Sequence, residues 1–215
     1  MSKTVEMLKE YIPYNEQEKG DISLIIKAEE IFGDILTRDN EYCHLTSSAF
    51  IVNEAHDKVL CIYHNIYKSW TWVGGHADGD DDMKYVASKE TKEETSLSDF
   101  KVVGDGPISV EILPVKSHVR KGKYVASHTH FNITYLLEAS EESAIHILED
   151  ENSGIGWLTF EELISRSDEP YMVPVYKKII EKIKGLWCPF CLDFISHFFI
   201  NSAIEFEFSS FWNLL

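Results

Sequence analysis

Positive charge is scarce in this sequence. Its 215 residues include 20 Lys and Arg against 36 Asp and Glu, which gives a formal net charge of −16. Binding to a phosphate backbone depends on neutralisation by Lys and Arg, so polymeric nucleic acid and anionic membrane are disfavoured as partners. A small anionic substrate remains compatible with the chain if a cation bridges it to acidic residues.

Cysteine is also sparse. The four cysteines, Cys43, Cys61, Cys188 and Cys191, do not form the dense framework of a small disulfide-rich domain. Residues 1–21 lack the apolar segment of a secretory signal, so we expect a cytoplasmic protein. Cys188 and Cys191 have C-x-x-C spacing, but the chain has no second such pair and no thioredoxin-like context, which disfavours a redox or zinc function for them.

The composition, 44% hydrophobic and 26% charged, is that of a globular chain with one domain and additions at its ends. Apolar residues at helical spacing predict helices within residues 1–36. We expect a helical extension over 1–39, a main domain over 40–185 and a separate tail over 186–215.

Within the main domain the spacing of apolar residues changes along the chain. Helices are expected over 82–95 and toward the C-terminal Gly185. Strands on both sides of a helix predict a mixed α/β layered fold. Runs rich in β-branched and aromatic residues predict strands at 45–53, 58–65, 69–75, 100–115, 128–139 and 154–159.

The tail over 186–215 contains nine aromatic residues and no Lys or Arg. Asp193, His197 and Asn201 interrupt its apolar run, so it does not read as a membrane-spanning helix. Three interpretations stay open: packing on the domain, formation of a homodimer, or a non-native extension of the reading frame.

Acidic residues are concentrated between Gly75 and Leu97, where seven of them accompany three lysines. "DGDDD" places aspartates at alternating positions, as a calcium-binding EF-hand loop does. That loop also needs Gly at its sixth position and Glu at its twelfth, where this chain has Met83 and Lys89. A calcium loop is therefore excluded.

A solvated helix face is the usual role of such a charge run, but the helical geometry of 82–95 argues against it. The apolar face that begins at Met83 continues, by steps of three and four, into carboxylates rather than apolar residues. The lysines fall on the opposite face, where we also place Thr95. The inward carboxylates belong to Glu90 and Glu94, with Glu93 on the flank.

Inward-facing carboxylates are costly unless they are paired or bind a metal. Three of them together repel one another, and the nearest lysines face away, so a hard divalent cation with oxygen ligands is the simplest partner. Mg²⁺ held in this way bridges carboxylates to phosphate groups and activates water. The stretch therefore predicts hydrolysis at a phosphate or diphosphate.

The same stretch resembles the signature of the Nudix hydrolase (MutT-like) family, G-x5-E-x7-R-E-U-x-E-E-x-G-U, where U is a bulky aliphatic residue. Gly75 and the three glutamates match by identity, and "KETKEETSL" keeps the spacing. The departures are Asp81 for Glu, Lys89 for Arg, Thr91 for the aliphatic residue and Ser96 for Gly. The chain is thus similar to the family with a degenerate box at Gly75–Leu97.

This resemblance implies a Nudix-type α/β/α sandwich with a mixed sheet. It also implies Mg²⁺- or Mn²⁺-dependent hydrolysis of a nucleoside diphosphate linked to another moiety. By analogy, Glu90 and Glu94 are the principal ligands, Glu93 is a further ligand or the catalytic base, and the Gly74 carbonyl is an additional ligand. Asp81 and Lys89 keep the signs of a structural ion pair that joins loop to helix in the family.

Further candidates lie outside the box. Many family members add an acidic ligand shortly before a strand that contains Trp, and Glu151 before Trp157 fits that place; a solvated loop acid is the alternative. Arg120 belongs to a basic loop that either clamps phosphate or is simply exposed. Trp72 either stacks a base or packs in the core, the more frequent role.

Three histidines are candidates for substrate contact. His76 directly follows the two glycines, and His128 and His130 share one face of a predicted strand. A zinc site needs at least three protein ligands, most of them nitrogen or sulfur. The sequence does not indicate which residue would join His128 and His130 as the third. Contact with substrate or plain packing is therefore favoured over zinc.

Two other functions stay open. Isopentenyl-diphosphate isomerases share the fold and a related box, and such enzymes generally need a cysteine near the diphosphate, for which Cys61 is the candidate. A nucleotide-binding module without turnover is the second, because the box has four departures. In each case the expected partner is a small phosphorylated molecule.

Overall fold

The computed structural model describes residues 2–120, 122–147 and 152–187. The chain divides into two compact units, Met1–Ile179 and Ile180–Leu215. The residues discussed as sites all lie in the first unit. The expected tail, apart from its first two residues, and the Cys188–Cys191 pair lie outside the described residues.

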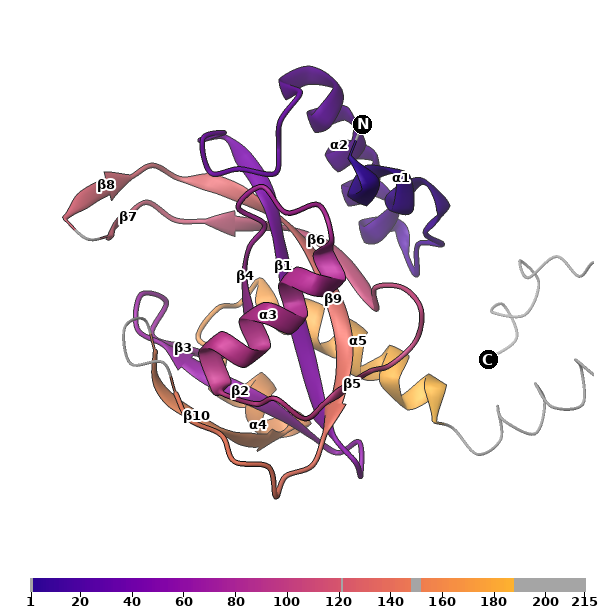
Figure 1. Cartoon of the computed structure of the whole chain (residues 1–215), viewed down its shortest axis with the longest axis vertical. Coiled ribbons are helices and arrows are strands. Elements are labelled where there is room, and N and C mark those ends of the chain that lie inside the picture. Colours follow the sequence, from indigo (N-terminus) through magenta and orange to yellow (C-terminus); the bar gives the residue numbers. More distant parts are fainter. Residues whose placement is uncertain (1, 121, 148–151, 188–215) are drawn as a thin grey trace, which may run out of the picture. The chain divides into compact units, whose positions relative to one another are not determined.

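The centre of the first unit is a mixed sheet with the path β10-β2-β1-β9-β5; β3 pairs with β2, β4 with β1 and β6 with β9 (Figure 1). β1 and β9 are parallel, whereas the other pairings are antiparallel. The strands are β1 (Cys43–Asn53), β2 (Lys58–His64), β3 (Ser69–Thr71), β4 (Val73–His76), β5 (Lys101–Val102), β6 (Ser109–Val115), β9 (His128–Ala139) and β10 (Asn152–Thr159). A small hairpin of β7 (His118–Arg120) and β8 (Lys123–Val125) extends from β6 and β9 (Figure 1).

Five helices accompany these strands in the described ranges: α1 (Lys3–Glu10), α2 (Glu16–Phe32), α3 (Met83–Thr95), α4 (Phe160–Arg166) and α5 (Met172–Leu186). Four begin at a polar cap whose side chain accepts a backbone N–H bond, as favoured at helix N-termini; these caps are Ser2, Asn15, Asp82 and Thr159. The mixed α/β fold is confirmed, and the expected elements are present except that the stretches 69–75 and 100–115 each form two strands rather than one. α5 continues one residue beyond the end predicted at Gly185.

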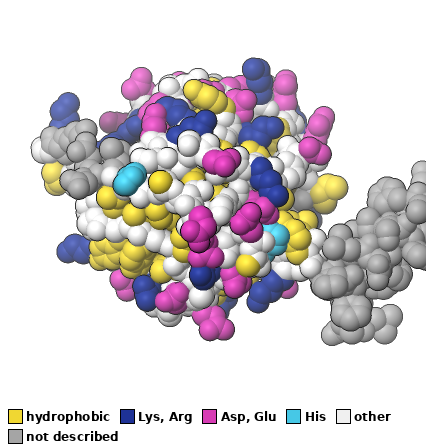
Figure 2. All heavy atoms as spheres, turned by 60° about the horizontal axis from the view of Figure 1, so that its bottom comes forward, with side chains coloured by type: hydrophobic (Ala, Val, Ile, Leu, Met, Phe, Trp, Pro, Cys, Tyr) yellow, Lys and Arg dark blue, Asp and Glu magenta, His cyan; other side chains and the backbone are white. Residues whose placement is uncertain are grey.

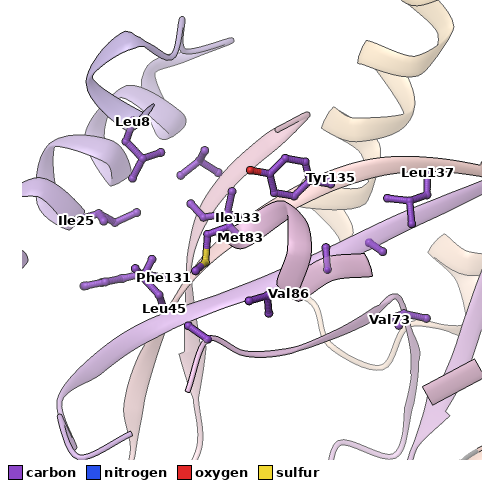
Figure 3. Close-up of a cluster of buried hydrophobic side chains, with 14 of the residues drawn as sticks. Leu8, Ile25, Leu45, Val73, Met83, Val86, Phe131, Ile133, Tyr135 and Leu137 are labelled. Atoms are coloured by element: carbon purple, nitrogen blue, oxygen red, sulfur yellow. The ribbon is translucent and has the colours of Figure 1, made fainter. Parts of the chain in front are cut away.

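One face of the sheet packs against α1, α2 and α3. Leu8 and Ile25 from the N-terminal helices and Met83 from α3 join Leu45 and Ile133 from the strands in one buried cluster (Figure 3). The first 36 residues thus contribute to the same core as the strands. Burial of each large aliphatic side chain stabilises the fold by roughly 1.5–3 kcal/mol.

The opposite face of β1 packs against α4 and the beginning of α5. The ring centroids of Phe50 and Phe160 lie 6.4 Å apart, and those of Phe50 and Tyr176 also lie 6.4 Å apart. Side chains alternate along a strand, so Phe50 shares its face with His44, Thr46 and Ser48. That polar half of the face is where the cavities described below lie.

A buried polar network joins α2, β6 and α5. Lys178 Nζ lies 3.0 Å from Glu18 Oε1 and 2.9 Å from Glu111 Oε1, and all three side chains are less than a tenth exposed. Tyr11 donates a 3.0 Å hydrogen bond from its hydroxyl to Glu18, and the Tyr14 backbone N–H donates a 2.7 Å bond to the same carboxylate. One ammonium therefore serves two buried carboxylates.

The molecular surface agrees with the charge balance of the sequence. On the face shown in Figure 2, acidic side chains lie among Lys and Arg side chains, without a broad basic area. No helix in the described ranges combines the length and apolar character needed to cross a membrane.

Candidate active site

The glutamates of α3 lie beside the free edge of β4. The Gly74 backbone N–H donates a 3.1 Å hydrogen bond to Glu94 Oε2, and Asn152 Nδ2 donates a 3.3 Å bond to Glu94 Oε1. Among the strands in the described part of the chain, β4 pairs with β1 alone, which leaves this N–H available. Strand β4 and the start of β10 thus orient the Glu94 carboxylate.

Gly75 makes room for Glu90. A Cβ at position 75 would overlap the Glu90 carboxyl group, whereas a Cβ at position 74 would come within 2.8 Å of the Ser47 backbone oxygen. Both glycines are needed because other groups approach the backbone closely. The Glu90 side chain is 16% exposed, and burial raises its pKa above the usual value.

Glu93 lies differently from its two neighbours. Its side chain is 54% exposed, with Lys89 Nζ at 3.9 Å. It does not line the two cavities described below. Of the three glutamates, the structure therefore brings Glu90 and Glu94 together at the interior and leaves Glu93 at the surface.

The expected ion pair between Asp81 and Lys89 does not form in the structure. Asp81 instead accepts hydrogen bonds from the backbone N–H groups of Lys3 and Thr4, at the beginning of α1, and from the Thr4 hydroxyl at 2.9 Å. Lys89 lies 3.9 Å from Glu90 and from Glu93. The reason is that the N-terminal helix supplies the Asp81 carboxylate with nearer donors.

The buried face of α3 also differs from expectation in its threonines. Thr95, placed with the lysines on the solvent face, is fully buried, as is Thr91. The Thr91 hydroxyl donates to the Ala87 carbonyl oxygen at 2.8 Å, and the Thr95 hydroxyl donates to the Thr91 carbonyl oxygen at 2.6 Å. With its hydroxyl satisfied by its own helix, Thr91 can occupy the position where the family pattern has an aliphatic residue.

Ser96 ends α3 in the left-handed region, at φ 57° and ψ 4°, a conformation that favours glycine. We expect Ser96→Gly to raise the free energy of unfolding by about 0.5–1 kcal/mol, because relief of this strain exceeds the entropy that glycine adds to the unfolded chain. Urea denaturation measures the change. A Ser96→Ala variant, which keeps the strain, is the control and should show no gain; equal stability of all three proteins would contradict the argument.

A cavity of about 210 Å³ opens beside the two glutamates. Its polar lining comes from β1, β4 and β9, and it also contains Arg38 and Arg120. Asp78 holds Arg38 through both guanidinium nitrogens Nε and Nη2. The cavity thus combines carboxylates with positive charge, as a site for a metal-associated phosphate requires.

Several of the predicted contact residues line this cavity: His76, His130, Arg120 and Trp72. His128 lines a neighbouring cavity of about 270 Å³ instead. Trp72 is 7% exposed and its ring packs edge-on against Tyr176, with 5.4 Å between the centroids, so it is largely a core residue. Glu151 lies outside the described residues.

The sequence did not point to three other groups of the site. Arg38 follows the N-terminal helices, Glu169 and Tyr171 come from the segment before α5, and all line the same cavity. Burial raises the pKa of the Glu169 carboxyl, which accepts a hydrogen bond from the Tyr171 hydroxyl. These residues carry no local pattern, so only the fold reveals them.

Cys61 is not part of the site. It is fully buried on β2 and lines neither cavity. Burial raises the pKa of its thiol well above the usual range, which keeps it protonated and unreactive. The structure therefore gives no support to the isomerase alternative that rested on this cysteine.

The chain thus has a mixed α/β fold in which two glutamates of one helix lie at a Gly-Gly strand edge. A family model of the NUDIX domain matches residues 44–183. The chain belongs to this family, and it is a hydrolase that acts on diphosphate bonds.

Several solved structures are similar to part of this chain. A C. elegans Ap4A hydrolase in a binary complex is 20% identical, with a TM-score of 0.50 over 66% of this chain and 98% of its own. A NUDIX family hydrolase from Clostridium perfringens is 20% identical, with a TM-score of 0.46 over 65% and 97%. The E. coli dihydroneopterin triphosphate pyrophosphohydrolase is 15% identical, with a TM-score of 0.48 over 64% and 95%. Among curated protein sequences, none matches this chain.

Proposed function

We propose that this protein is a Mg²⁺- or Mn²⁺-dependent pyrophosphohydrolase that cleaves the diphosphate bond of a nucleoside diphosphate linked to another moiety. The observation that carries the proposal is the meeting of Glu90 and Glu94 at one cavity with Arg38 and Arg120. Acidic ligands and arginines in one cavity suit a substrate that carries phosphate together with a divalent cation.

The residues present fit such a cation. The donors at the edge of β4 are carboxylate oxygens, which Mg²⁺ and Mn²⁺ prefer. The Glu90 carboxyl is largely buried and its nearest ammonium, Lys89 Nζ, is 3.9 Å away, so a bound cation would stabilise the buried anion further. Glu90 and Glu94 would be the principal ligands, with Glu93 as a further ligand or base and the Gly74 carbonyl as an additional ligand.

The chain itself supplies orientation and charge. Gly74 and Asn152 hold the Glu94 carboxylate in place, and Gly75 lets Glu90 approach the strand. Arg120 and Arg38 would bind the phosphate oxygens of the substrate and offset the charge that develops during attack by water. A bound divalent cation would polarise the phosphoryl oxygen and lower the pKa of the attacking water.

A screen of nucleoside diphosphate compounds with Mg²⁺ and with Mn²⁺, with the products resolved, tests this function. A nucleoside monophosphate and a phosphorylated second product are expected from at least one compound. An isomerised diphosphate with unchanged mass would instead favour the isomerase alternative. Binding of nucleotides without any product would favour the non-catalytic module.

Gly75→Ala is expected to lower kcat/KM by about 10–100-fold, because its Cβ would push the Glu90 carboxyl out of place and small displacements of catalytic groups have effects of this size. The fold should survive, since the clashing group is the end of a flexible side chain. Steady-state kinetics and thermal unfolding measure the two effects. Gly156→Ala, whose Cβ would meet nothing within 4 Å, is the control; an unchanged kcat/KM in Gly75→Ala would contradict the role of Glu90.

A further inference from the structure

A cluster of histidines lies at the end of the β-sheet face that also leads to Glu94. The structure adds a histidine that the sequence did not indicate, His44 on the central strand β1, and it places His76 beside His130. The register places His44 opposite His130 on β9 and Thr46 opposite His76 on β4. Because alternate residues share a face, three neighbouring strands present their imidazoles on one side of the sheet.

The rings are close enough to share one ion. One ligand atom from each of His44, His76 and His130 lies within 4.8 Å of the others. Ring centroids are 5.1 Å apart for His44 and His76, 5.0 Å for His44 and His130, and 4.8 Å for His76 and His130. Zn–N bonds of about 2.0–2.1 Å place tetrahedral ligand atoms about 3.3–3.4 Å apart, a contraction that small rotations of the side chains can supply.

His44 carries an independent sign of a ligand. Its Nδ1 lies 3.0 Å from the Asn40 carbonyl oxygen, so Nδ1 carries the proton and Nε2 presents a lone pair. That Nε2 atom is buried and has no hydrogen-bond partner in the described protein, although an unsatisfied buried polar atom costs about 1–3 kcal/mol. A backbone carbonyl that fixes one ring nitrogen while the other faces a metal is the usual arrangement of a histidine ligand.

His128 extends the cluster. Its Nδ1 lies 2.9 Å from the Ala126 carbonyl oxygen, and its Nε2 lies 3.2 Å from His130 Nε2. This short contact is a hydrogen bond between the two rings. The ring of His128 is 4.9 Å from that of His44, which places a fourth imidazole beside the three.

The chemistry of the cluster suits a borderline metal. Its members are imidazoles, which are common ligands of Zn²⁺-class ions, and His44 is only 4% exposed. Positive charge nearby is offset in part, because Asp78 neutralises Arg38.

We propose that His44, His76 and His130 bind a transition-metal ion of the Zn²⁺ class at a site distinct from the carboxylate site of α3. Three imidazoles leave one position open toward the cavity, which His76 and His130 line together with Glu90 and Glu94. A phosphate of the substrate is the ligand that this open position would take. The ion at the histidines would thus hold the substrate, while the carboxylates carry the hydrolysis.

Direct binding of Zn²⁺ to the full-length chain tests this proposal without any assay of activity. The protein carries Cys188→Ser and Cys191→Ser to remove thiol ligands, is freed of metal with a chelator, and is dialysed against Zn²⁺ in excess Mg²⁺. One equivalent of bound Zn²⁺ is expected. Co²⁺ in its place should give the strong visible absorption of a site with four ligands.

His76→Gln and His130→Gln should each weaken Zn²⁺ binding by about 100-fold or more, since even changes beside a ligand cost 10–100-fold. Both residues are partly exposed, so these variants should fold even if His44→Ala does not; circular dichroism checks this. His146→Gln, at an exposed histidine, is the control and should bind Zn²⁺ normally.

Glu94→Gln separates this site from the proposed catalytic one, because it should keep its Zn²⁺. Absence of a bound equivalent, or unchanged binding in both histidine variants, would overturn the proposal. Loss of Zn²⁺ in Glu94→Gln with retention in the histidine variants would also overturn it, by assigning the ion to α3.

Discussion

Glu94→Gln is expected to lower kcat/KM with Mg²⁺ by about 10³-fold, which corresponds to about 4 kcal/mol of transition-state stabilisation. The amide keeps the shape of the side chain but removes the charge that a divalent cation needs. Gly74 N–H donates to Glu94 Oε2, and the amide oxygen can accept the same bond. The thermal unfolding temperature should therefore change little.

Variants of other glutamates are the controls for this experiment. Glu30→Gln, at an exposed position of α2, should leave the kinetics unchanged. Glu93→Gln should show a smaller loss than Glu94→Gln, because the Glu93 side chain is half exposed and lies toward Lys89. Full activity of Glu94→Gln on the compound that the screen identifies would refute the catalytic assignment.

The sequence predicted α3 and the position of Glu90 and Glu94 beside the two glycines, because the signals there are local. Helical period, two glycines and the spacing of the glutamates all lie within one short stretch, and the structure places Glu90 and Glu94 where that pattern indicates. The burial of Thr95 was missed because its hydroxyl is satisfied within the helix. A polar residue of that kind has no distinct pattern in a sequence.

What could not be predicted depends on long-range pairing. His44 is a single histidine in a strand, and only the parallel register of β1 with β9 places it opposite His130. The hydrogen-bond donors to Asp81 likewise lie in α1, 77 and 78 residues away, and Lys89 is not among them. Such partners follow from how the N-terminal helices dock, which no local spacing records.

Docking of the N-terminal helices also places Glu18 of α2 beside Lys178 of α5. Lys178→Met is expected to lower the free energy of unfolding by about 3–5 kcal/mol, the usual result of breaking a buried ion pair by removing one partner. Lys178 is 6% exposed, and its ammonium lies within 3.0 Å of both Glu18 and Glu111. Methionine fills the space but leaves two carboxylates buried without a cation. Urea denaturation measures the loss, and Lys177→Met, at an exposed position of the same helix, should stay within about 0.5 kcal/mol.

The loss should depend on pH in a direction that identifies its cause. Burial raises the pKa of Glu111 and Lys178 lowers it, with Glu18 as the other charge that faces it. Removing Lys178 therefore raises this pKa further, so the folded state binds more protons than the unfolded state and gains stability as pH falls from neutrality toward the ordinary glutamate pKa of about 4.3. The deficit of Lys178→Met relative to the wild type should thus shrink at acid pH, and Glu111→Gln should recover part of it at pH 7. A deficit that is the same at both pH values and unaffected by Glu111→Gln would show instead that Lys178 acts through packing alone.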